Sequence, residues 1–124
     1  MIEKPSASFR DPSGFIFTQN SVVFRQVNQA GRESYDGLMQ SGLYERLSKA
    51  KALVTHEEVP LSLAPVAELA YKVILPRPIP FISYPYEWCF EQLKDAAILT
   101  LSIARRALDY GLSLKDASAY NVQF

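Results

Sequence analysis

Residues 113–124 carry the side chains of this sequence whose types and spacing could do chemistry. Asp116 stands five residues before Asn121, after a long helical pattern and before a β-type run at residues 122–124 (VQF). A carboxylate can take up a proton from a hydroxyl group, and a carboxamide oxygen can hold a hard cation. The same two residue types also occur in ordinary loops, where Asp begins a turn and Asn hydrogen-bonds to nearby backbone. The spacing alone leaves both interpretations open.

The spacing resembles the catalytic loop of kinase-like phosphotransferases, H-R-D-x-x-x-x-N, in which the Asp positions the accepting hydroxyl and the Asn holds a magnesium ion. By that resemblance Asp116 is the candidate catalytic base, Asn121 is the candidate metal ligand, and the implied cofactor is a magnesium nucleotide. The flanking letters depart from the pattern. Leu114 and Lys115 stand where that family has His and Arg, and Ser118 stands where protein kinases have Lys.

Arg25 and Glu45 are the candidate cofactor-binding residues on the phosphate side. Arg25 lies in the middle of a predicted strand, where it could reach a phosphate or a carboxylate, or be an exposed residue of an edge strand. Glu45, on a predicted helix, could pair with Arg25 as the strand Lys and helix Glu pair in kinases. It could equally be a surface Glu beside Arg46. His56 precedes two carboxylates that could tune it as a base, but a surface histidine is the alternative.

Composition limits the classes of protein that remain. The 124 residues suffice for about one domain, and 48% hydrophobic with 21% charged residues is typical of a soluble globule. The 13 basic and 13 acidic side chains cancel, so we expect neither nucleic acid nor a membrane surface as a partner. A single cysteine, Cys89, and no apolar leader favour the cytoplasm. One histidine and one cysteine far apart do not make a zinc site.

The front of the chain predicts a β-hairpin. Residues 15–17 (FIF) and 22–27 (VVFRQV) are β-branched or aromatic, and the polar turn 18–21 (TQNS) separates them. Residues 1–14 precede the hairpin as an irregular segment with a DPSG turn. From residue 28 the spacing becomes helical, and Ser41 with Gly42 predicts a break between two short helices.

The middle of the chain predicts two further strands, at residues 70–75 (AYKVIL) and 81–84 (FISY). The three prolines at 76, 78 and 80 exclude helix between them and favour extended chain. Residues 55–58 (THEE) lead into a loop or short connection at 60–65. Residues 82–88 read as an aromatic crossover into the helix that follows.

Residues 87–110 predict one long helix with a broad apolar stripe, closed by Gly111 as its C-cap. A helix with so broad an apolar surface needs cover on most sides, and a chain of this length offers little. We therefore expect exposed apolar surface, and a homodimer or aggregation of the isolated chain through this helix. The fold class is α+β: a small antiparallel sheet with a β-hairpin, two short helices and one long C-terminal helix. We expect Asp116 and Asn121 to leave the end of that helix and face one hollow beneath the hairpin.

The order of these elements resembles the N-lobe and the start of the C-lobe of a protein-kinase-like fold. Four phrases resemble the region ahead of the methyltransferase domain in bacterial S-adenosylmethionine-dependent methyltransferases of the nodulation-protein type. The phrases are residues 9–14 (FRDPSG), 41–45 (SGLYE), 80–88 (PFISYPYEW) and 115–121 (KDASAYN).

The resemblance covers nearly the whole chain and implies its domain organisation. Residues 1–124 would be a single, incomplete kinase-like N-terminal region of a longer protein. It would comprise the irregular segment 1–14, a sheet with short helices at 15–86, and the long helix with the catalytic-loop-like segment at 87–124. The partner would be a downstream methyltransferase domain, and S-adenosylmethionine would bind only through that domain.

Two features of the kinase pattern are missing from residues 1–124. The hairpin turn holds no G-x-G-x-x-G to cradle phosphates, and a second metal-binding Asp would lie past residue 124. The sequence also holds no Gly-rich turn of a methyl-donor site. Three functions stay open. The first is an accessory region that binds a nucleotide or substrate without being catalytic by itself, and the second is a non-enzymatic interaction module. The third is the front fragment of a small-molecule phosphotransferase, in which Asp116 is the base, Asn121 binds magnesium and Arg25 binds phosphate.

Overall fold

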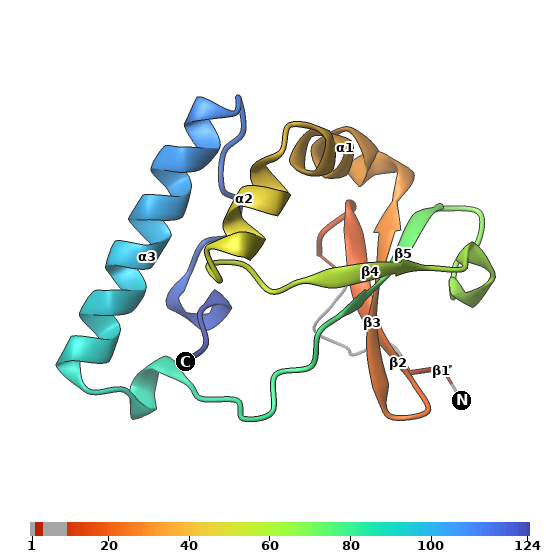
Figure 1. Cartoon of the computed structure of the whole chain (residues 1–124). Coiled ribbons are helices and arrows are strands. Elements are labelled where there is room, and N and C mark those ends of the chain that lie inside the picture. The colour runs from red at the N-terminus through yellow and green to blue at the C-terminus, as the bar shows by residue number, and fades with distance from the viewer. Residues whose placement is uncertain (1, 4–9) are drawn as a thin grey trace.

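The computed structural model describes residues 2–3 and 10–124, in which a small sheet lies beside three helices (Figure 1). Of the segment predicted as irregular, residues 1 and 4–9 lie outside the described residues, and residues 2–3 form a short strand. The strands are β1 (Ile2–Glu3), β2 (Gly14–Gln19), β3 (Val22–Asn28), β4 (His56–Val59) and β5 (Ala70–Pro76). The α-helices are α1 (Arg32–Gln40), α2 (Leu43–Lys49) and α3 (Phe90–Asp109). The 3-10 turns are η1 (Gln29–Gly31), η2 (Leu61–Leu63), η3 (Pro85–Glu87) and η4 (Ala119–Asn121).

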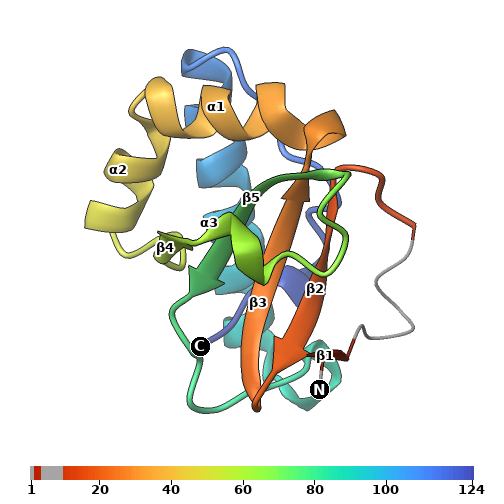
Figure 2. The ribbon, with the colours of Figure 1, turned by 90° about the vertical axis from the view of Figure 1, so that its right-hand side faces the viewer.

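All strand pairs in the sheet are antiparallel, in the order β1-β2-β3-β5-β4. Helix α1 lies across one end of the sheet, and α3 lies beyond α2, on the side of α2 that is away from the sheet (Figures 1 and 2). The predicted α+β class, with its hairpin, two short helices and long last helix, is confirmed.

The predicted hairpin is present as β2 and β3, with longer strands and a tighter turn than the sequence pattern predicted. Gln19 pairs with Val22, so only Asn20 and Ser21 form the turn, with φ of 50° and 64°. Two residues with positive φ match the right-handed twist of hairpin strands, and Asn adopts this conformation more readily than most residues. The polar residues at 18 and 19 therefore belong to the sheet.

The two faces of the sheet are covered by different segments. On one face Phe15, Phe17 and Val73 pack against partly buried residues of β4 and of the segment around η2; Phe17 and Val73 have no exposed surface. A second cluster joins α1 to the sheet through Val27, Tyr35 and Ile74. The sheet thus has small cores on both sides, as an α+β domain of this size requires.

A buried glutamine fastens the segment around η2 to the sheet. The side chain of Gln26 is fully buried, and its Oε1 accepts from the N–H of Val66 at 3.1 Å. Its Nε2 donates to the carbonyl of Val66 at 3.0 Å and to Oδ1 of Asn28 at 2.8 Å. A buried amide with all these bonds made is stabilising, whereas an unpaired one would destabilise the fold.

The predicted break between the two short helices is confirmed at Ser41 and Gly42. Gly42 has a left-handed φ of 88°, and Oγ of Ser41 accepts from the N–H of Leu43 at 3.3 Å. The turn directs α2 toward α3, where Leu43 and Leu47 pack with Ala107 in a third cluster. This contact holds the last helix against the rest of the chain.

Two strand predictions in the middle of the chain are wrong. Residues 56–59, expected before a loop, form β4 and pair with β5 at the edge of the sheet. An edge strand that is exposed on its outer side needs few apolar residues, so the polar sequence HEEV of β4 did not indicate a strand. Residues 81–84, expected as a strand, form none, because both sides of β5 are already occupied by β3 and β4.

The long helix is confirmed, although it begins three residues later than the predicted start at Glu87. The 3-10 turn η3 takes Pro85–Glu87, and Gly111 closes the helix with φ of 74°. Residues 122–124 are not a strand, against expectation. Val122 is extended, but Phe124 contacts Trp88 ring to edge, at 5.0 Å between centroids, in place of a strand neighbour.

The predicted exposure of apolar surface on α3 is also confirmed. Only Ala96 and Ala107 of this helix are buried, and Leu101 and Leu108 are 69% and 68% exposed. The large apolar residues of α3 that are exposed are Phe90, Leu93, Ile98, Leu101 and Leu108. None of the helices in the described part of the chain has the length and hydropathy of a membrane span.

Candidate functional site

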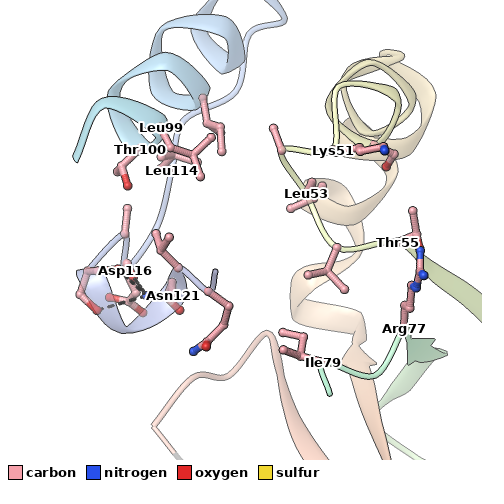
Figure 3. A pocket seen from close by; sticks show the side chains of 18 of the residues that line it. Lys51, Leu53, Thr55, Arg77, Ile79, Leu99, Thr100, Leu114, Asp116 and Asn121 are labelled. Atoms are coloured by element: carbon pink, nitrogen blue, oxygen red, sulfur yellow. Dashed lines mark hydrogen bonds between the residues drawn. The ribbon is translucent and has the colours of Figure 1, made fainter. Parts of the chain in front are cut away.

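A pocket of about 700 Å³ lies between α3 and the two segments that flank β4 and β5. One wall consists of residues 51–55, with Ser48, and residues 77–80. The other consists of residues on α3 and of the C-terminal segment, including Asp116 and Asn121 (Figure 3). The expected shared hollow therefore exists, but no residue of the hairpin lines it.

Asp116 is placed on the pocket wall by a loop with an unusual backbone. Its φ is 53°, in the left-handed region that Asp tolerates better than most residues, and its carbonyl accepts from the N–H of Ser118 at 2.8 Å. Its carboxylate has no hydrogen-bond or ion-pair partner among the residues that the structure describes. Two acceptor oxygens are thus available at the pocket.

Asn121 closes the same loop by bonding to its backbone. Its Nδ2 donates to the carbonyl of Asp116 and, at 3.2 Å, to Oγ of Ser118. This matches the loop interpretation of the spacing, in which Asn hydrogen-bonds to nearby backbone. Because carbonyl oxygens only accept, these bonds orient Nδ2 toward the loop and leave Oδ1 without a donor in the described part of the chain. Structural and ligand-binding uses of this side chain are therefore compatible.

The oxygen atoms of Asp116 and Asn121 are of the kind that magnesium, the ion implied by the kinase-loop resemblance, takes as ligands. Magnesium takes oxygen ligands and commonly uses one or two protein side chains, with water and phosphate completing its shell. Asp116 would supply a carboxylate oxygen, and Asn121 would supply Oδ1. In the described residues no three His, Cys, Asp or Glu side chains gather as a metal cluster, so water or a bound ligand would have to supply the remaining oxygens.

Arg25 and Glu45 do not form the expected ion pair. Nη2 of Arg25 lies 3.7 Å from Oδ2 of Asp11, and Glu45 lies 2.7 Å from Nζ of Lys49, one turn along α2. The hydrogen bond from Lys49 lowers the pKa of the Glu45 carboxyl. Arg25 sits in a strand at the centre of the sheet, and α2 carries Glu45 on an exposed face toward its own helix neighbour, so a contact within one element prevails. Neither residue lines the pocket.

Lys51 and Arg77 line the pocket, although no sequence pattern identified them as candidate site residues. Arg77 stands between Pro76 and Pro78, a rigid setting that is the one sequence signal for it. Lys51 follows α2 in a left-handed conformation, with φ of 55°. Figure 3 shows both on the wall opposite Asp116 and Asn121.

His56 belongs to a polar network at the edge of the sheet and is half-buried, against the expectation of a surface histidine. Its Nε2 lies 3.0 Å from the hydroxyl of Tyr35, which donates to Glu58 at 3.1 Å. Since that hydroxyl has one proton, Nε2 is the donor to Tyr35. Glu58 also holds Nζ of Lys72 at 2.6 Å.

The network shifts the pKa values of its members. Burial lowers the pKa of His56, although the nearby charge of Glu58 opposes the shift. The hydrogen bond from Lys72 lowers the pKa of Glu58, and burial raises the pKa of Tyr35. The ring of His56 bonds to Tyr35 on α1, and its backbone N–H and carbonyl bond to the hydroxyl of Tyr44 on α2, so this residue fastens β4 to both helices.

The chain is similar to the Nodulation protein NoeA of Rhizobium meliloti (strain 1021). The two sequences are 34% identical over 120 residues, which is 96% of this chain and 25% of NoeA. The chain therefore spans about a quarter of the length of the relative that it matches. No family model matches the sequence, and no solved structure matches it.

Proposed function

We propose that this chain is the N-terminal accessory region of a S-adenosylmethionine-dependent methyltransferase, kinase-like in fold, that binds a nucleotide or substrate and is not catalytic by itself. The similarity to NoeA over nearly the whole chain, but a quarter of NoeA, supports a region of a larger protein. S-adenosylmethionine would bind through a downstream domain, because the sequence lacks the Gly-rich turn of a methyl-donor site.

One observation carries the ligand-binding part of this proposal. Asp116 and Asn121, singled out by their spacing, lie on one wall of the same pocket, and neither the carboxylate of Asp116 nor Oδ1 of Asn121 has a partner among the described residues. Unpaired acceptors at a cavity are suited to a ligand or a hydrated cation, since a ligand there gains bonds without breaking any within the protein.

Thermal unfolding with magnesium and ATP tests this part. A ligand present at a hundred times its Kd should stabilise the chain by about 2.7 kcal/mol. Asp116→Asn should abolish the part of the shift that depends on magnesium, because it removes the charge while Asn still tolerates a positive φ. S-adenosylmethionine should produce no shift in this chain.

Asp95→Asn is the matched control, because Asp95 is exposed on α3 and does not line the pocket. It should bind magnesium and ATP as the wild type does. The absence of any shift in the wild type, or an equal shift in Asp116→Asn, would contradict the ligand-binding part of the proposal.

The downstream methyltransferase domain is the proposed partner of α3. Leu101 and Leu108 lie in solvent along this helix, and such a stripe of apolar residues marks a surface that another protein surface covers. The same observation favours the second candidate function, a non-enzymatic interaction module. The remaining three quarters of NoeA, expressed separately and mixed with this chain, should form a complex that Leu101→Gln weakens.

The other candidate, the front fragment of a small-molecule phosphotransferase, uses the same Asp116 and Asn121 and adds Arg25 on phosphate. Arg25 lies 3.7 Å from Asp11 and outside the pocket lining, so it offers this candidate no support. Phosphoryl transfer by residues 1–124 would be detected as ATP consumption that requires Asp116. We expect none.

A further inference from the structure

Two basic side chains on the pocket wall opposite Asp116 have no role in the proposed function. Lys51 follows α2 and Arg77 follows β5, and both line the pocket. Neither has an ion-pair partner in the part of the chain that the structure describes. Lys72, by contrast, holds Glu58 at 2.6 Å. An unpaired cation at a cavity is a position where an anionic group of a ligand gains Coulomb energy.

The backbone holds the two cations on one wall. The N–H of Arg77 donates to the carbonyl of Thr55 at 2.8 Å, which joins the segment after β5 to the segment before β4. The N–H of Ala52 donates to the carbonyl of Leu47 at 2.9 Å and closes the end of α2 around Lys51. Figure 3 shows Lys51, Thr55 and Arg77 on the same side of the pocket. A ligand would therefore meet a wall that is already built.

The charged groups around the pocket leave a positive excess. Nζ of Lys115 lies 3.0 Å from Oδ1 of Asp11, which lies outside the pocket lining and is shared with Arg25, so its charge is offset in part. Lys51 and Arg77 then oppose the single carboxylate of Asp116. A magnesium ion on Asp116 would increase the excess, so the pocket favours an anion with or without metal.

The remaining lining suits an apolar body. Side chains from both walls are apolar, among them Leu53, Val54, Ile79, Leu99, Leu114 and Val122. Ligand pockets combine such surfaces with a few charged or polar groups, and the volume of about 700 Å³ is in their usual range. A ring held between these walls could present one charged group to the cations.

We infer that the pocket takes a phosphate monoester with an aromatic body, its phosphoryl group bound by Lys51 and Arg77 and its ring between the apolar walls. The guanidinium fork of Arg matches two phosphate oxygens, and the Lys ammonium acts as a point charge. The inference rests on the proposed function, because it names the ligand class of the same pocket. It needs no metal on Asp116 or Asn121.

Phenyl phosphate and adenosine 5′-monophosphate are suitable probes, with phenol and adenosine as uncharged counterparts, all without divalent cations. In a titration of the ¹⁵N-labelled chain followed by nuclear magnetic resonance, both phosphates should cause saturable shifts at residues 51–55 and at Arg77. The double variant Lys51→Gly and Arg77→Gln should bind phenyl phosphate at least about tenfold more weakly, which corresponds to about 1.4 kcal/mol. Gly accepts the positive φ at position 51, so the fold should be kept.

The matched control is the double variant Arg46→Gln and Lys94→Gln, which removes the same charge from exposed helix positions outside the pocket lining. It should bind as the wild type does. Equal losses in both double variants would assign the effect to net charge and overturn the inference. So would an unchanged affinity of the pocket variant, equal binding of phenol, or no saturable shift with either phosphate.

The two proposals fail separately. Binding of phenyl phosphate without metal that requires Lys51 and Arg77 supports this inference even if magnesium produces no effect through Asp116. A magnesium effect through Asp116 with unchanged phosphate binding by the pocket variant supports the proposed function and overturns this inference.

Discussion

The sheet and the last helix of this protein both carry large apolar side chains, which are buried at the core of the sheet and mostly exposed on the helix. Phe17 and Val73 in the sheet have no exposed surface, whereas Leu101 and Leu108 on α3 are 69% and 68% exposed. Helix α3 packs on α2 through Ala107 and the partly buried Ile103, and only Ala96 and Ala107 of its side chains are buried. Burying one large apolar side chain is worth roughly 1.5–3 kcal/mol. The sheet therefore obtains its stability within the chain, and α3 retains a surface that a partner could still stabilise.

The largest test of this comparison is a truncation in the sheet. Phe17→Ala removes a fully buried ring from the cluster with Phe15 and Val73 and should lower the free energy of unfolding by about 3–5 kcal/mol. Phe90→Ala on α3, where the ring is 73% exposed, is the control and should change it by less than about 0.5 kcal/mol. Urea unfolding measures both. Equal losses would mean that the two regions do not differ.

A smaller effect is expected from pH, and it should come from the edge of the sheet. Burial lowers the pKa of His56 in the folded state, so its contribution is complete above the ordinary pKa of 6.5 and is lost as the pH falls through the folded value. The hydrogen bond from Lys72 lowers the pKa of Glu58 below 4.5, so a second loss should follow on further acidification. The free energy of unfolding, measured from pH 8 to pH 3, should decrease in these two windows.

His56→Gln identifies the first window, because it removes the titrating group and leaves Glu58 with Lys72. Its unfolding free energy should be nearly constant between pH 8 and about pH 5.5 and should decrease only in the second window. A wild-type protein that becomes more stable as the pH falls from 7 to 6 would show that the sign assigned to His56 is wrong.

The smallest effect on stability should come from the exposed face of α3. Leu101→Gln with Leu108→Gln should change the free energy of unfolding by less than about 0.5 kcal/mol, because both side chains lie mostly in solvent. The same variant should bind less hydrophobic dye and sediment as a smaller species than the wild type. A clean wild-type monomer with little dye binding would contradict the predicted association through this helix.

Local patterns predicted the elements that local chemistry determines. The alternation of the hairpin, the break at Ser41 and Gly42, and the apolar stripe of α3 each depend on residues close together in the chain. The predictions that are wrong concern partners distant in sequence. The strand β4 exists because β5 offers it an edge, and residues 81–84 do not pair with β5 because β3 and β4 already occupy both of its sides.

The candidate site likewise contains residues that local sequence could predict and residues that only the fold brings together. Asp116 and Asn121 could be singled out because their spacing places them in one loop, and the hydrogen bond from Asn121 to the carbonyl of Asp116 shows that loop closed. Lys51 and Arg77 could not, because they reach the opposite wall from two other segments. No local pattern relates a residue after α2 to one after β5, or either of them to the C-terminal loop.

By itself the sequence determined the helices, the hairpin and the loop between Asp116 and Asn121, because propensity, periodicity and turn chemistry act over a few residues. Only the tertiary structure decided which strand edges are filled, which apolar face stays in solvent, and which charges surround the pocket. Those outcomes depend on which distant surfaces meet when the chain packs, and the free energy of each contact depends on what its neighbours have already buried.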